Sequence, residues 1–355
     1  MAKPIVISGI QPSGRLHIGN YLGALKNFVD LQNSGKYTCF FFVADYHSLT
    51  ETFNAKEKRA QITDLMASYL ASGLSPKKSV LFTQSALPAH TELAWILNTI
   101  TPMGELKRMT QFKDKRTKVA QSEVFGKVIS GESNSDTNDI IDKEIDSHTN
   151  VGLFEYPVLM AADILMYDAS VVPTGDDQDQ HLELARTLAR KFNSRFGETF
   201  REPKNLHTTT PRVMSLDNPA KKMSKSSPAG CVFIDDTDEV IRDRFMRAVT
   251  DSGHEIAFDP ETKPGISNLL TIASAVTGRG ILEIVEQFKG ATSYADFKKF
   301  VAETVVTYFA PIREAKLKLM KKPSAINAPF VKGSKVAGKI AEKKMKVVKK
   351  AVGLE

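Results

Sequence analysis

The sequence contains little cysteine and lacks any long apolar run. Its two cysteines, Cys39 and Cys231, are too few for a disulfide framework, and Cys39 lies in an apolar run typical of a buried core. The longest apolar runs, such as 39–44 and 158–162, are far shorter than the ~20 residues that cross a bilayer. The N-terminus shows neither a signal-peptide nor a transit-peptide pattern. We therefore expect a cytoplasmic protein that does not enter a membrane.

The overall composition excludes three further classes. Of the 355 residues, 42% are apolar and 25% are charged, which is unlike disordered, collagenous or coiled-coil chains. The length allows a sizeable core, and at ~100–200 residues per domain it favours two domains.

The net charge of +7 is spread unevenly along the chain. Residues 313–355 carry 13 Lys and Arg against 3 Asp and Glu, whereas the rest of the chain carries 35 against 38. A solvated helix face and a surface for a polyanion such as RNA are both compatible with this basic segment.

Short runs rich in Val, Ile and Phe alternate with segments of helical period in the first part of the chain. The runs are IVISG, YTCFFFVAD, SVLFTQS and ASVVPTG, and the helical patterns that follow them cover 19–33, 56–72, 89–100 and 177–196. Such alternation is typical of βαβ units. It predicts an α/β fold with a Rossmann-type, doubly wound parallel sheet.

This alternation stops near residue 228. Helical patterns at 238–250, 266–277, 281–289, 293–320 and 334–351 follow, separated by Pro and Gly. We therefore expect a first domain at 1–227 and a second, all-helical domain at 228–355. A polar insertion at 116–150 interrupts the first domain, and its segment 130–148 holds six acids and one lysine. This composition indicates a surface insertion or a partly disordered loop, to which we assign no chemistry.

The segment at 8–20, SGIQPSGRLHIGN, lies between the first strand and the first helix. Glycines there let the backbone approach a ligand, and N–H groups at a helix start suit a phosphate. The C-terminal edge of a parallel sheet is also where α/β proteins bind nucleotides. The segment is a candidate nucleotide site, with a purely structural turn as the alternative.

A second cluster, KKMSKSS at 221–227, combines three ammonium groups with three hydroxyls on a segment without an apolar period. Mobile cations can follow a phosphate whose charge is being redistributed, although a solvated linker has the same composition. HIGN followed by KMSKS, at the start and the end of one β-α array, is the two-part signature of class I aminoacyl-tRNA synthetases.

The segment YPVLMAADILM at 156–166 is predicted to be helical with Pro157 in its first turn, which places Tyr156, Met160 and Asp163 on one face. A carboxylate in an apolar stretch is costly unless it accepts hydrogen bonds, so Asp163 is either satisfied by the protein or available to a ligand donor. An apolar slot with one acceptor suits an indole N–H.

The run VVPTGDDQDQH at 171–181 ends a strand and enters a helix near Asp177. Acids at a helix N-terminus are usually caps. In this crevice, Asp176 or Asp177 could instead accept hydrogen bonds from ribose hydroxyls.

The chain resembles bacterial-type tryptophanyl-tRNA synthetases over nearly its whole length. The resemblance rests on GIQPSG with the GNYLGAL helix, and on the segments 104–115, 152–167, 172–184, 213–226 and 263–270. The tyrosyl enzymes share the fold and the phosphate motifs but not the AADIL segment.

The resemblance implies a role for each matching residue. ATP would be held by Gln11, Pro12, Ser13, His17, Gly19 and Asn20, with Val213 near the adenine and Gly175, Asp176 and Asp177 at the ribose or adenosine. The loop that would close over the phosphates consists of Lys222, Met223, Ser224, Lys225 and Ser226, and the implied catalytic residues are His17, Asn20, Lys222 and Lys225. The implied tryptophan ligands are Asp163 for the indole N–H, Met160 for the ring, and Tyr156 and Gln178 for the amino group.

Two residues of the implied indole pocket depart from the family pattern. Ile7 stands where the family often has an aromatic residue, and Thr174 stands where it often has Val. The insertion at 116–150 is also longer than the usual connector. The first two departures bear on the fit and affinity of the indole pocket, whereas the role of the insertion stays open.

The implied reaction joins L-tryptophan to tRNA(Trp) through tryptophanyl-adenylate, with release of pyrophosphate. Mg²⁺ would accompany ATP, held by phosphates and water, without a metal cage of protein side chains. The resemblance also implies a homodimer, and tRNA is expected to meet the basic C-terminal region. A tyrosyl-specific or otherwise shifted relative, and a non-catalytic paralogue that binds tryptophan or RNA, are the alternatives.

Overall fold

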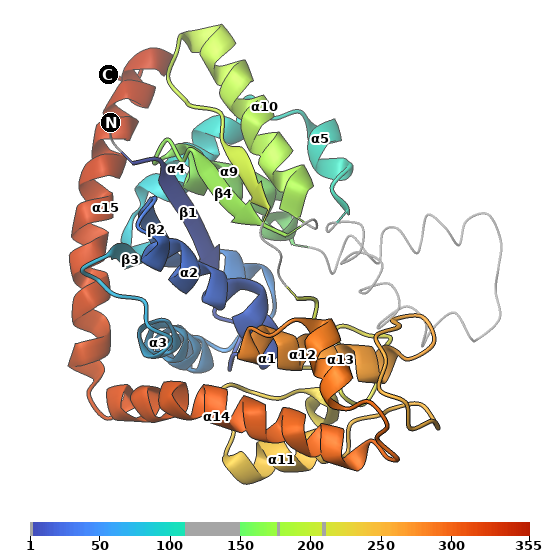
Figure 1. Ribbon diagram of the computed structural model, residues 1–355. Coiled ribbons are helices and arrows are strands. Elements are labelled where there is room, and N and C mark those ends of the chain that lie inside the picture. Colours follow the sequence, from blue (N-terminus) through green and yellow to red (C-terminus); the bar gives the residue numbers. More distant parts are fainter. Residues whose placement is uncertain (1–2, 111–149, 176–177, 208–210) are drawn as a thin grey trace, which may run out of the picture.

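The structure is a computed structural model, and it describes residues 3–110, 150–175, 178–207 and 211–355. A five-stranded parallel sheet has the order β3-β2-β1-β4-β5 (Figure 1). Its strands are β1 (Ile5–Ile10), β2 (Thr38–Val43), β3 (Ser79–Thr83), β4 (Val171–Thr174) and β5 (Lys204–His207). The strand order reverses beside β1, where β2 pairs on one side and β4 on the other. The predicted doubly wound α/β fold is confirmed, and its switch point is a place where such sheets bind ligands.

Helices cover both faces of this sheet. The first helical stretch consists of α1 (Ile18–Asn20), a π-helical turn η1 (Tyr21–Leu25) and α2 (Lys26–Ser34). The other helices around the sheet are α3 (Ala55–Ala71), α4 (Ala89–Asn98), α5 (Met103–Lys107), α9 (Val151–Leu165) and α10 (Asp179–Phe196). The C-terminal part contains α11 (Asp238–Met246), α12 (Pro264–Thr277), α13 (Ile281–Gln287), α14 (Ala295–Met320) and α15 (Pro323–Val352). Single turns lie at His47–Thr50, Gln84–Ala86 and Pro228–Gly230.

Alternate residues of the strands pack into two hydrophobic cores. Val6 and Phe41 belong to the core on the α2 and α3 face, whereas Ile7 and Phe42 belong to the core on the α4, α9 and α10 face. This alternation is what a strand buried on both faces requires, and it explains why the strands read as continuous apolar runs.

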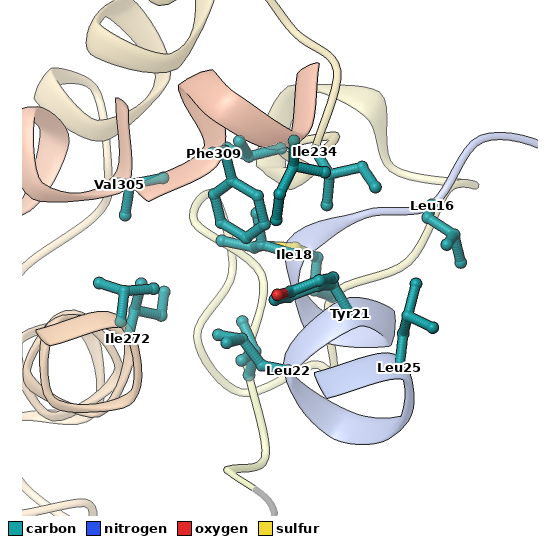
Figure 2. Packing of buried hydrophobic residues seen from close by; sticks show 14 of the residues in the cluster. Leu16, Ile18, Tyr21, Leu22, Leu25, Ile234, Ile272, Val305 and Phe309 are labelled. Carbon is teal, nitrogen blue, oxygen red and sulfur yellow. The ribbon is translucent and has the colours of Figure 1, made fainter. Parts of the chain in front are cut away.

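The first core continues from the sheet into the C-terminal helices. Figure 2 shows Ile18 and Tyr21 of the first helical stretch beside Phe309 of α14. The Tyr21 and Phe309 rings lie 5.0 Å apart in an edge-to-face arrangement. The first helical stretch therefore packs in a core to which both the N-terminal and the C-terminal parts of the chain contribute.

Helix α15 lies along the outer strand of the sheet and not among α11–α14 (Figure 1). Its buried face contains small residues spaced four apart, Gly333, Ala337 and Ala341. A Cβ on Gly333 would come within 1.9 Å of the Leu81 carbonyl oxygen of β3, so only glycine permits this approach. The sequence analysis grouped this helix with the second domain, but α15 packs mainly on β3, α3 and α4 and makes fewer contacts with α14. The boundary at 227 and 228 stays a prediction.

One local expectation was wrong, and one element was missed. Helix α9 begins at Val151, capped by the Asn150 side chain that accepts from the Leu153 N–H, so Pro157 lies inside the helix and not in its first turn. The edge strand β5 was not predicted, because KNLH has no strand pattern and forms by pairing with β4. Nearly all of the predicted insertion at 116–150, together with Asp176 and Asp177, lies outside the described residues.

Within the described ranges, no single helix is long and apolar enough to cross a membrane. One pair of helices in the described part of the chain, α12 with α13, passes that test together and is bent by 109°. Most of α12 is buried among other helices of the core.

Candidate active site

A cavity of about 310 Å³ opens at the C-terminal ends of β1 and β4, where the strand order reverses. Seven residues singled out in the sequence line it: Ile7, Gln11, Tyr156, Met160, Asp163, Gly175 and Gln178. Helix α9 supplies three of them from one face, as the spacing predicted. Thr174 also lines the cavity, and its buried Oγ1 has no hydrogen-bond partner among the described residues. The structure thus brings these residues together, while their individual roles stay predictions.

Asp163 is buried at the inner end of this cavity, with 2% of its surface exposed. Its Oδ2 lies 2.8 Å from His47 Nε2 and its Oδ1 lies 2.6 Å from His90 Nδ1. The Gln84 side-chain amide donates to both oxygens at 2.9 Å. Burial opposes the charge of Asp163, but the hydrogen bonds from the two histidines outweigh it and lower the pKa. Asp163 is therefore an anion that three side chains of the protein hold by hydrogen bonds and that also lines the cavity.

Hydrogen bonds connect Tyr156 and Gln178 through His181, which was not predicted to belong to the site. The Tyr156 hydroxyl lies 3.0 Å from His181 Nε2, and His181 Nδ1 lies 3.0 Å from Gln178 Oε1. Burial raises the pKa of Tyr156 to about 12, so its hydroxyl keeps its proton at neutral pH. The two side chains proposed for the substrate amino group are thus held in one chain of hydrogen bonds.

His17 and Asn20 form the start of the first helix. The Asn20 backbone N–H donates to His17 Nδ1 at 3.1 Å, which leaves the ring hydrogen on Nε2. Burial, together with the charges of Lys225 and Lys222, lowers the pKa of His17 to about 4. At neutral pH the ring is therefore an uncharged N–H donor. A Cβ on Gly19 would lie 3.0 Å from this ring, so the glycine leaves room for it.

The loop around Lys225 closes onto the turn that follows β1. Lys225 Nζ donates to Ser13 Oγ at 3.1 Å and to the Gly14 carbonyl oxygen at 3.2 Å. The Met223 N–H donates to the Val213 carbonyl oxygen at 3.1 Å, so the buried Met223 and Val213 fix the base of the loop. The loop of the second signature motif is therefore in direct contact with the turn that precedes the first motif, although the two are far apart in sequence. Ser224 and Ser226 hydroxyls lie 2.9 Å apart on its outer side.

Three further cations support this crevice and were missed in the sequence. Lys58 Nζ donates to the Pro12 carbonyl oxygen at 3.4 Å, and burial lowers the pKa of Lys58. Arg15 is paired with Asp235 at 2.5 Å, and the same carboxylate accepts from Lys316 of α14 at 2.8 Å. Because these partners lie on different segments, no local pattern could reveal them.

The donor set around the crevice suits phosphate oxygens and not a metal. Ammonium, imidazole N–H and hydroxyl groups dominate it, contributed by Lys225, His17 and Ser13. Among the residues that the structure describes, no group of three or more His, Cys, Asp or Glu side chains could hold a metal ion.

Comparisons with a family model and with known relatives both identify similarity to tRNA synthetases. The model of the family "tRNA synthetases class I (W and Y)" matches residues 1–310. The tryptophan–tRNA ligase of Leifsonia xyli subsp. xyli is 43% identical over 355 residues, covering 99% of this chain and 97% of that protein.

Solved structures agree with the sequence relatives. The tryptophanyl-tRNA synthetase of Mycoplasma pneumoniae is 32% identical with a TM-score of 0.81, covering 99% of this chain and 98% of its own. That of Campylobacter jejuni, in complex with ADP and tryptophan, is 35% identical with a TM-score of 0.77, covering 98% and 99%. The chain therefore belongs to the class I tRNA synthetases for tryptophan and tyrosine, and among them to the tryptophan–tRNA ligases.

Proposed function

We propose that this chain activates L-tryptophan with ATP and transfers it to the 3′ end of tRNA(Trp). One observation carries the proposal: an apolar cavity that ends on the buried Asp163 anion lies beside the crevice where Lys225 meets Ser13. The cavity offers an acceptor for an indole N–H, and the crevice offers donors for phosphates. Protein synthesis takes place in the cytoplasm, and we propose that location.

The first step needs no general base. The tryptophan carboxylate is ionised at pH 7 and attacks the α-phosphorus of ATP, which forms the O–P bond of the adenylate while the bond to pyrophosphate breaks. What the protein must supply is alignment and stabilisation of the charge that moves to pyrophosphate. In our proposal His17 donates its Nε2–H to a phosphate oxygen, Asn20 contacts the nucleotide, and Lys222 and Lys225 follow the leaving group.

The remaining assignments divide between nucleotide and amino acid. We propose that Gln11, Pro12, Ser13, Gly19, Val213, Met223, Ser224 and Ser226 surround ATP, together with Gly175, Asp176 and Asp177. Tyr156 and Gln178 hold the amino group, while Ile7 and Met160 flank the ring. Mg²⁺ enters with ATP, bound by phosphates and water, since the crevice offers cationic and hydroxyl groups.

In the second step, a ribose hydroxyl of the terminal tRNA nucleotide attacks the tryptophanyl carbonyl and AMP leaves. The first step is tested by ATP–pyrophosphate exchange without tRNA, with tryptophan and tyrosine offered separately. We expect exchange with tryptophan only. Exchange with tyrosine would favour a shifted specificity, and no exchange from a folded protein that binds tryptophan would contradict catalysis.

We propose that tRNA contacts the exposed face of α15. Six lysines, spaced three or four residues apart and therefore on one side of the helix, are exposed there: Lys332, Lys335, Lys339, Lys343, Lys346 and Lys350. Their stripe is about 27 Å long at ~1.5 Å per residue. The opposite face packs on the sheet, so the stripe points to solvent and suits a phosphate backbone.

Charge reversal tests this surface better than truncation, because removing α15 would expose β3. The triple variant Lys335→Glu, Lys339→Glu, Lys343→Glu is expected to raise the KM for tRNA about tenfold or more and to lower its salt dependence. ATP–pyrophosphate exchange should stay unchanged. Lys36→Glu with Lys77→Glu, both exposed elsewhere, is the control. An unchanged KM for tRNA would contradict the proposal.

We also propose a homodimer through the surface around Trp95 on α4. This residue is 70% exposed, and with Leu49 and Leu159 it lines a shallow apolar depression of about 290 Å³. Val151, 67% exposed, lies at the start of α9. Large apolar side chains gathered on one surface are typical of protein contacts.

Sedimentation of Trp95→Lys tests the dimer. We expect its dissociation constant to rise about tenfold or more, while Leu282→Lys, at an equally exposed leucine on α13, leaves the dimer intact. A parent protein that is monomeric at micromolar concentration would contradict the homodimer, and a dimeric Trp95→Lys would contradict this surface.

A further inference from the structure

Behind Asp163, away from the cavity, two buried residues continue its hydrogen-bond network. His90 of α4 contacts Asp163 through Nδ1 at 2.6 Å, and its Nε2 lies 2.9 Å from the Tyr167 hydroxyl. His90 is fully buried and Tyr167 is 1% exposed. Neither residue lines the cavity, so neither can touch a substrate there.

The chemistry of the three groups fixes where the protons lie. Asp163 is a carboxylate and only accepts, so His90 must carry its hydrogen on Nδ1. Burial and the nearby charge of Asp163 raise the pKa of Tyr167, so its hydroxyl stays protonated. With its hydrogen on Nδ1, His90 can donate to Asp163 and accept the Tyr167 hydroxyl hydrogen at Nε2. In this series of hydrogen bonds each donor has one acceptor, and the series runs from Tyr167 through His90 to Asp163, which lines the cavity.

The hydrogen bonds around Asp163 also limit how its carboxylate can rotate. His47, Gln84 and His90 approach its two oxygens from three different segments, and Asp163 at the same time lines the cavity. Without the Tyr167 hydroxyl, the Nε2 of a fully buried ring has no other recorded partner among the described residues. The ring could then turn, which would loosen its hold on Oδ1.

We propose that Tyr167 and His90 are positioning residues that aim the Asp163 carboxylate at the indole N–H and thereby sharpen the selection of tryptophan. This inference rests on the proposed function, in which tryptophan is the substrate. It assigns specificity to two residues that never touch the amino acid.

The test compares tryptophan with 3-(benzothien-3-yl)alanine, in which sulfur replaces the indole N–H at nearly the same size. The ratio of kcat/KM values in ATP–pyrophosphate exchange measures selection for the N–H. Tyr167→Phe is expected to lower this ratio by about threefold to tenfold, as expected for one lost hydrogen bond, through the value for tryptophan. The kcat/KM for the analogue and the KM for ATP should stay within about twofold of the parent.

Two further variants separate positioning from general structure. His90→Leu is expected to lower the ratio at least as much as Tyr167→Phe, whereas His90→Asn should recover part of it because its amide N–H can replace Nδ1–H. Tyr294→Phe is the matched control, since this buried tyrosine donates to Asp251 at 2.7 Å near the start of α14. Its ratio should equal that of the parent.

Several results would overturn the inference. Equal losses for both amino acids in Tyr167→Phe would show a structural role, and so would a His90→Asn protein no better than His90→Leu. Asp163→Asn provides the benchmark: if it lowers the ratio and Tyr167→Phe does not, the indole contact stands and the positioning role fails. If Asp163→Asn leaves the ratio unchanged, the premise itself fails.

Discussion

Replacing Lys225 by Ala should lower the rate of adenylate formation far more than it weakens tryptophan binding. In the structure its ammonium group reaches Ser13 Oγ at 3.1 Å and the Gly14 carbonyl oxygen at 3.2 Å. Burial lowers the pKa of Lys225, which indicates poorly hydrated surroundings where a charge interacts strongly. One preorganised donor at a site of developing charge contributes about 3–4 kcal/mol, so we expect kcat to fall roughly 10²- to 10³-fold.

The assay is ATP–pyrophosphate exchange with ATP and tryptophan varied separately, together with a direct measurement of tryptophan binding. We expect the KM for tryptophan and its dissociation constant to change less than about threefold, because Lys225 does not line the tryptophan cavity. Lys221→Ala is the matched control: it removes an exposed lysine of the same segment and should change kcat less than twofold.

A different pattern would refute this reasoning. If Lys225→Ala kept kcat within about threefold of the parent while the KM for ATP rose tenfold or more, the ammonium group would act on bound ATP and the transition state equally. Lys225 would then be a binding residue, and stabilisation of the leaving pyrophosphate would have to come from elsewhere in the crevice.

Three other predictions follow from buried charges. Asp163→Ala should lower kcat/KM for tryptophan about 10- to 100-fold, with the KM for ATP changed less than threefold and an unchanged circular dichroism spectrum. The pKa of His17 is about 4 in the fold and near 6.5 when unfolded, so the unfolded chain binds the extra proton first as pH falls. Protonation of His17 should therefore lower the free energy of unfolding by about 3 kcal/mol between pH 6.5 and 4. Urea unfolding curves of His17→Asn should lack this loss. Lys316→Met leaves Asp64 and Asp235 without the ammonium group that lies 2.6 and 2.8 Å from them, so the free energy of unfolding should fall by about 3–5 kcal/mol, and a loss below 1 kcal/mol would contradict this.

The sheet and most helices could be predicted because their signals are local. Strands buried on both faces read as runs such as CFFFV of β2, and the helices carry their own period. Strand β5 had no such signal, because its pairing with β4 alone makes it a strand. The position of α15 was missed although Gly333, Ala337 and Ala341 are spaced for close packing, since the pattern does not say which surface they pack on.

The site could be predicted where its residues share a motif or a helix face. Tyr156, Met160 and Asp163 follow from helical spacing on α9, and Lys225 follows from its loop. The partners of Asp163 did not follow: His47 and His90 lie 116 and 73 residues away from it in the chain. Contacts between distant segments depend on the folded sheet, so sequence spacing carries no information about them.

Asp163 and Lys225, the two charged residues proposed to matter most for selectivity and rate, differ in how firmly the fold holds them. Asp163 is fixed by three donors inside the core, on a helix packed between α4 and α10. Lys225 instead extends from a loop that Met223 holds at its base, and its ammonium group contacts the turn after β1. A group that selects a substrate must be oriented before the substrate arrives, because reorientation would cost part of the discrimination. A group that follows a departing pyrophosphate must instead move with it. Stiffening the loop should therefore lower kcat, while loosening the network behind Asp163 should lower selectivity.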